Sequence, residues 1–192
     1  MGTTTEKQYV AFAGATRLAE GTLADVAIAV IRAASTATTI QPLIFDAETG
    51  EQIDVDLRGT EEEVRLRLQP VPRTPRPPGR PKLGVVPREV TLLPRHWEWL
   101  ASQPGGASVT LRKLVDAARK VSGDADQVRH SQEAAYRFMN ALAGNEPGFE
   151  EATRALFAGD AAGFSALTES WPTDVRDEAR RTAAGAFTGA TA

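Results

Sequence analysis

The first 68 residues combine short hydrophobic segments with turn-forming residues, a pattern typical of strands. Residues 9–12 (YVAF) form one such segment, and residues 16–20 can return as its partner. Residues 42–46 form another strand, followed at 47–50 by the turn chemistry of a hairpin with glycine at its end. Hydrophobic and polar side chains then alternate over 53–58, which is the two-residue period of a half-buried strand.

Two helices are expected among these strands. Thr22 is a suitable N-cap for a mostly buried helix over 23–34, with an acidic residue in the capping-box position. Thr60 caps a shorter helix over 61–68, whose first turn holds three acidic residues where the helix dipole favours them. Residues 7–68 therefore predict a small α+β domain with a mostly antiparallel sheet.

A proline-rich segment over 69–87 follows this domain. Its seven prolines remove backbone donors and fix φ, so an extended linker is expected, and it gives the clearest domain boundary in the chain.

Residues 88–122 predict a strand, a helix, a turn and a second helix. Val90 to Leu93 form the short strand, and a helix over 95–103 ends at a Pro-Gly-Gly sequence. Ser108 is the expected N-cap of the second helix, which covers 109–121.

Residues 123–187 predict short helices that glycine, aspartate and proline interrupt, as in a small helical bundle. The whole chain is accordingly expected to be an α+β protein, with the small N-terminal domain, the linker, the strand–helix–helix unit and this C-terminal bundle in sequence order.

Charge is distributed unevenly over these regions. Residues 1–68 and 123–192 each carry a net charge of −5, whereas 69–122 carry +7, within a total of −3. Asymmetry of this kind indicates a polyanionic partner for the middle of the chain. The alternative is that the two acidic regions dock on the basic one.

Composition narrows the functional classes. The 192 residues include no cysteine and two histidines, which excludes disulfides and thiolate metal sites and leaves little for a histidine metal site. Phosphate-loop, dinucleotide and nucleophile-elbow motifs are absent from the sequence. We therefore expect no enzymatic activity, no cofactor and no metal. With neither an apolar run of membrane-spanning length nor a secretory signal pattern, a cytoplasmic location is expected.

The basic linker is the first candidate site. Residues 73–82 hold four cations and no acid, and the Gly79-Arg80-Pro81 sequence resembles an AT-hook, which places Arg in the narrow minor groove of A·T-rich DNA. Pro78 stands where that motif has Arg. The alternative is a proline-rich tether that its arginines keep soluble.

The strand–helix–helix unit is the second candidate site, and it resembles the ribbon–helix–helix family of DNA-binding dimers. The resemblance rests on the short strand, on the Gly106-Ala107-Ser108 turn and on the apolar face of the helix after it. It implies an antiparallel homodimer through residues 89–93, with the second helix holding a backbone phosphate at its N-terminus. Neither face of the strand carries the side chains that read base edges. The alternative is a helical hairpin that links two domains.

Several phrases along the chain resemble a bacterial family of uncharacterised domains over roughly residues 9–180. They are LIFDAETG (43–50), DLRGTEEEV (56–64), GRPKLGVVPREVTLLPRHWEWLASQPGGAS (79–108), YRFMNALAG (136–144) and GFEEATRALFAGD (148–160). The resemblance implies a bacterial cytosolic origin and brings no activity or site residue.

Two functions remain open. The first is a DNA-binding regulatory protein that contacts duplex DNA through Arg73, Arg76, Arg80, Lys82, Arg88, Ser108, Arg112 and Lys113. The second is a non-enzymatic interaction or scaffold protein without a nucleic-acid partner, whose acidic domains bind other proteins.

Overall fold

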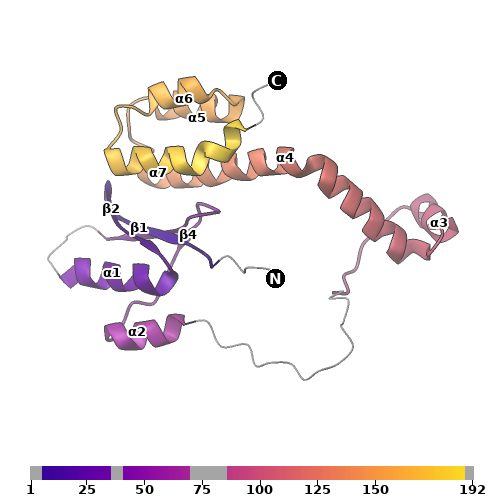
Figure 1. Cartoon of the computed structure of the whole chain (residues 1–192), viewed down its shortest axis with the longest axis horizontal. Helices are drawn as coiled ribbons and strands as arrows, with labels where there is room; N and C mark the ends of the chain where they lie inside the picture. Colours follow the sequence, from indigo (N-terminus) through magenta and orange to yellow (C-terminus); the bar gives the residue numbers. More distant parts are fainter. Residues whose placement is uncertain (1–5, 36–40, 70–85, 189–192) are drawn as a thin grey trace. The chain divides into compact units, whose positions relative to one another are not determined.

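The computed structural model describes residues 6–35, 41–69 and 86–188 (Figure 1). The chain divides into two compact units. The larger unit combines Met1–Pro70 with Asp124–Ala192, and the smaller unit is Val71–Gly123, which lies between those two stretches in the sequence.

A four-stranded antiparallel sheet organises the larger unit. Its strands are β1 (Tyr9–Ala13), β2 (Thr16–Gly21), β3 (Leu43–Asp46) and β4 (Gln52–Ile53), in the order β2-β1-β3-β4. The expected hairpin of β1 and β2 is confirmed, with Tyr9 opposite Gly21. The fourth strand is shorter than its alternating sequence suggests, but the burial of its side chains still alternates beyond Ile53.

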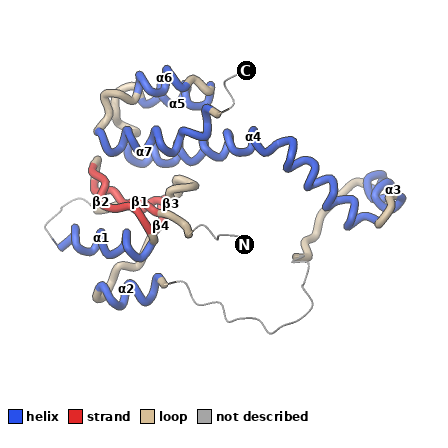
Figure 2. The backbone as a smooth tube through the Cα atoms, in the orientation of Figure 1, coloured by secondary structure: helices blue, strands red, loops and turns tan. Residues whose placement is uncertain are grey.

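Two helices, α1 (Leu23–Ser35) and α2 (Glu61–Leu68), follow the caps that the sequence predicts. The Thr22 hydroxyl accepts from the Asp25 amide at 3.3 Å. Thr60 makes a full capping box, because its hydroxyl accepts from the amide of Glu63 and its own amide donates to that carboxylate. Figure 2 shows α1 and α2 on one side of the sheet, where Ala11 and Ile44 pack with Val26 and Val30 of α1.

The opposite face of the sheet packs against C-terminal helices. These are the end of α4 (Gly106–Leu142), followed by α5 (Phe149–Ala158), α6 (Ala161–Leu167), α7 (Thr173–Ala183) and the short 3-10 helix η1 (Ala184–Phe187). Phe138 of α4 meets Phe12 and Phe45 edge-on, with both pairs of ring centroids 5.3 Å apart. The Arg17 amide also donates to the Asp174 carboxylate at 2.8 Å, which ties β2 to α7.

The α+β class is therefore confirmed. The larger unit, however, joins two stretches of the chain that were expected to form separate domains. Residues 7–68 and 123–187 were expected to fold separately, yet Phe12 and Phe45 share one buried hydrophobic cluster with C-terminal side chains such as Phe138. The reason is that both faces of the sheet are apolar. Helix α1 covers only the face that carries Ala11 and Ile44, so Val10, Phe12 and Phe45 need a second layer.

The described part of the smaller unit contains α3 (Pro94–Ser102) and the beginning of α4. The strand expected over Val90 to Leu93 is absent, since residues 86–93 have no regular secondary structure. A single short strand has no stability without a neighbour, and this chain offers it none in the described residues. The ribbon of the ribbon–helix–helix resemblance is thus not formed by the single chain.

The second helix of this segment is longer than expected at both ends. It begins at Gly106, so Ser108 lies within its first turn and is not its N-cap. It also continues through Gly123 and Asp124, where the sequence predicts an end. One glycine inside a helix costs only about 1 kcal/mol, which the packing of Ala134, Ala135 and Phe138 outweighs.

Candidate nucleic-acid interface

The two units differ in the ion pairing of their described Lys and Arg side chains. Every described Lys and Arg of the larger unit pairs with a carboxylate. In the described part of the smaller unit, no Lys or Arg makes an ion pair, and these cations are Arg88, Arg95, Arg112, Lys113, Arg119 and Lys120. These six described cations therefore have no carboxylate within ion-pair distance.

The structure describes only part of the predicted site. Arg73, Arg76, Arg80 and Lys82 lie outside the described residues. Arg88 is exposed in the irregular segment before α3, and Ser108, Arg112 and Lys113 are exposed near the start of α4. The Arg112 Nε donates to the Ser108 carbonyl at 3.1 Å, which leaves the rest of its guanidinium available.

Helix α4 adds two cations that the sequence reasoning missed. Arg119 and Lys120 follow Arg112 and Lys113 by seven residues, which is two helical turns, so the two pairs share one side of the helix about 10 Å apart. Asp116 lies between them on this side and lowers its net charge. The seven-residue spacing is visible in the sequence, and both pairs lie within the helix expected over 109–121, so this signal could have found them.

Two features restrict what this surface can read. Residues 86–93 do not form a strand in the single chain, so no β-ribbon is present to enter a major groove. Between Ser108 and Asp124, α4 carries no Asn or Gln, the side chains that recognise adenine. The arrangement suits contacts to the phosphate backbone.

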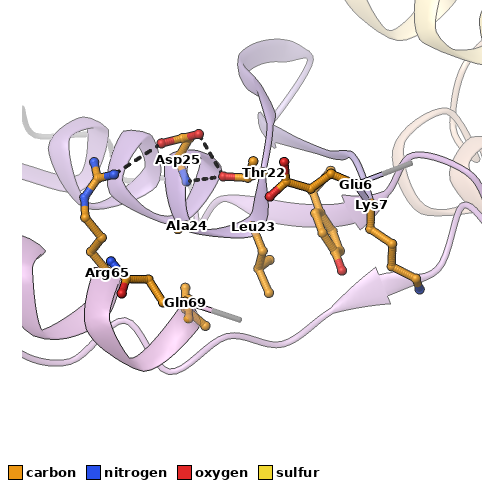
Figure 3. Close-up of a pocket in the computed structure, with 10 residues that line it drawn as sticks. Glu6, Lys7, Thr22, Leu23, Ala24, Asp25, Arg65 and Gln69 are labelled. Atoms are coloured by element: carbon orange, nitrogen blue, oxygen red, sulfur yellow. Dashed lines mark hydrogen bonds and ion pairs between the residues drawn. The ribbon is translucent and has the colours of Figure 1, made fainter. Parts of the chain in front are cut away.

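A polar pocket of the larger unit is the main alternative site (Figure 3). It has a volume of about 370 Å³, and its polar lining includes Lys7, Thr22, Asp25 and Arg65. Asp25 accepts from the Thr22 hydroxyl at 2.7 Å and lies 3.6 Å from an Arg65 nitrogen (Figure 3). Lys7 pairs with Asp46 at 3.1 Å. Lys7 and Arg65 each pair with a carboxylate, so the described lining of the pocket offers no unpaired cation to an anionic ligand.

The described residues contain no group of three or more His, Asp or Glu side chains that could hold a metal ion. None of their helices has the length and hydrophobicity needed to cross a membrane.

The fold and the ion pairs thus define a mixed α+β protein in which a basic segment interrupts, in the sequence, an acidic sheet-and-helix unit. The chain belongs to the family described as "Uncharacterized protein conserved in bacteria (DUF2239)", whose profile covers residues 8–183. This confirms the resemblance to an uncharacterised bacterial family. Neither a curated protein nor a solved structure matches the chain.

Proposed function

We propose that the protein is a DNA-binding regulatory protein of the bacterial cytoplasm, which contacts duplex DNA through its basic central segment. The observation that carries this proposal is the contrast in ion pairing. The described cations of the larger unit all pair with its own carboxylates, whereas the described cations of the smaller unit make no ion pair.

The affinity would come from phosphate contacts. Each neutralised phosphate releases condensed counterions, so the logarithm of the binding constant falls with the logarithm of the salt concentration by about 0.9 per contact. Engaging about 4–6 cations of the central segment corresponds to a slope of about −4 to −5. The −5 charge on each flanking region opposes this, so the affinity is expected near the nonspecific micromolar range.

The test is fluorescence anisotropy of a labelled random duplex titrated with the full chain between about 50 and 200 mM salt. Arg112→Ala combined with Lys113→Ala should make the slope shallower by about 2. A matched control combines Arg129→Ala with Arg154→Ala, which removes the same charge from arginines that pair with Asp126 and Glu151 at 2.8 and 2.7 Å.

The control variant should keep the slope of the parent chain. If both double variants made the salt slope shallower by the same amount, the effect would come from net charge alone. That result would contradict DNA binding through the central segment. No binding at about 50 mM salt would refute DNA binding altogether.

A non-enzymatic interaction protein is the second candidate. A different observation favours it, namely the large apolar side chains that the smaller unit exposes, among them Trp97, Trp99 and Val115. Large exposed hydrophobic side chains of this kind are typical of protein–protein contacts when they form a continuous patch.

A further inference from the structure

The described part of the smaller unit has almost no core of its own. Across residues 86–123 only Leu100 is buried, at 3% exposure. Large apolar side chains are instead exposed on the extended segment and on both helices, including Val90, Leu93, Trp97 and Val115. So few buried groups cannot offset the conformational entropy of ordering two helices, so the covering surface must come from elsewhere.

A groove lies within the described part of the smaller unit. It has a volume of about 270 Å³ and is lined by Leu92, His96, Trp99, Leu100, Leu111 and Leu114. On α3 the lining residues are spaced three and four apart, and so they share one side of that helix. Leu100 is its buried floor, while Trp99 and Leu114 are 51% and 47% exposed at its edges.

We propose that this groove binds the same groove of a second copy of the chain, forming a dimer with two-fold symmetry. The proposal does not depend on DNA binding. It differs from a dimer through residues 89–93 because the contact is made by the side chains of α3 and α4.

Charge favours a second copy as the occupant. In a two-fold interface each residue faces the same patch of its partner, so charged side chains would meet their like. The described residues that line the groove include no Asp, Glu, Lys or Arg. The cations Arg112, Lys113, Arg119 and Lys120 are absent from this lining, so the dimer would keep them in solvent.

The shape of the patch also suits self-association. The groove between α3 and the beginning of α4 is a hollow. Trp99 and Leu114 at its edges are exposed side chains that can fill the same hollow of a second copy. A nucleic acid would not cover such a surface, because its backbone requires charged or hydrogen-bonding groups, which the leucines and most of the other lining atoms do not supply. Aromatic side chains that fill an apolar pocket are instead the usual centre of a protein interface.

The test is sedimentation velocity of the full chain from about 1 to 100 μM. The parent chain should sediment at twice its mass of 20.5 kDa at the upper concentrations. Leu114→Glu should remain a monomer, since it would bury two like charges in the interface. Leu66→Glu is the matched control, because Leu66 is a 64% exposed leucine on α2 of the larger unit. It should dimerise like the parent chain.

A second measurement does not require the altered groove to fold. In a Trp97→Phe variant, Trp99 and the buried Trp171 are the remaining tryptophans. Acrylamide quenching of their fluorescence should fall as the protein concentration rises, because dimerisation buries Trp99. A parent chain that stays monomeric, an Leu114→Glu variant that dimerises, loss of the dimer in Leu66→Glu, or quenching independent of concentration would each overturn the proposal.

Discussion

Gly50 lies directly against the backbone of Ala134 in the larger unit. A Cβ placed on Gly50 would come within 2.1 Å of the Ala134 carbonyl oxygen, and the backbone of Gly50 has a φ of +66°. The turn between β3 and β4 therefore approaches α4 as closely as a residue without a side chain allows. Arg137 adds a hydrogen bond at this point, donating to the Thr49 carbonyl at 3.0 Å.

Replacing Gly50 with Ala should separate this turn from α4. We expect a loss of about 3–4 kcal/mol in the free energy of unfolding, because a backbone clash adds to the cost of a positive φ. Gly159→Ala is the control, since Gly159 has a similar φ of +72° but no atom within 4 Å of its would-be Cβ. It should lose only about 1–2 kcal/mol. Urea denaturation measures both, and equal losses would mean that the close approach contributes nothing.

Asp46 should make the larger unit sensitive to acid. Burial of this carboxyl raises its pKa, but the amides of Thr49 and Glu48 and the ammonium of Lys7 lower it more, so its pKa lies below the usual value. A carboxyl with a lowered pKa stabilises the fold above its unfolded pKa of about 3.9, and this contribution is lost as the pH falls through the folded pKa.

The Asp46→Asn variant tests this. It keeps an oxygen that can accept from both amides but loses the charge, so it should be about 1–2 kcal/mol less stable at neutral pH. Its stability should also fall less steeply than that of the parent chain below about pH 4. Asp54→Asn is the control, because Asp54 is exposed and makes no ion pair in the described residues. An Asp46→Asn variant with the acid sensitivity of the parent chain would contradict the role of this carboxylate.

Phe138 should hold the sheet and the C-terminal helices together. Phe138→Ala leaves a cavity between Phe12 and Phe45, and the expected loss is about 3–5 kcal/mol. Phe157→Ala provides the comparison, because Phe157 is half exposed and packs only beside Tyr136 among the aromatic rings described; its loss should stay near 1 kcal/mol. Thermal unfolding followed by circular dichroism distinguishes the two, and similar melting temperatures would contradict a shared core.

A fragment of residues 1–69 should not fold on its own. Its sheet would expose Val10, Phe12 and Phe45, which the full chain buries against the C-terminal helices. The fragment should therefore show no cooperative thermal transition. A sharp transition would instead support the independent N-terminal domain that the sequence predicts.

The linker cations can be tested in the same anisotropy assay. Arg80→Ala with Lys82→Ala should make the salt slope shallower by about 2, with similar losses on A·T-rich and mixed duplexes. A larger loss on A·T-rich DNA would indicate that the Gly79-Arg80-Pro81 sequence reads the minor groove. An unchanged slope would show that these two cations do not contact DNA.

Local signals in the sequence predicted the local structure well. The hairpin of β1 and β2 and the caps at Thr22 and Thr60 depend on neighbouring residues, and all are present. The shared core was missed because the second layer over the sheet consists largely of small residues, such as Ala135, Ala152 and Ala179, which give a weak periodic signal.

The sequence likewise predicted only part of the candidate nucleic-acid interface. Residue counts alone locate the positive charge, so the central segment could be identified from the sequence. Which cations are already neutralised depends on contacts between distant residues, such as Arg32 with Glu61. The cations Arg119 and Lys120 were missed although the helix expected over 109–121 already contains them.

Because the smaller unit lies between the two stretches of the larger unit in the sequence, the order of synthesis affects the order of folding. The ribosome releases the sheet first, then all of the smaller unit, and only afterwards the part of α4 that carries Phe138. At about 5–20 residues per second, the apolar face of the sheet stays uncovered for several seconds. During this time the smaller unit emerges complete, with its apolar groove open to a neighbouring nascent chain. Subunit pairing can therefore precede the final folding of the unit that encloses it in the sequence.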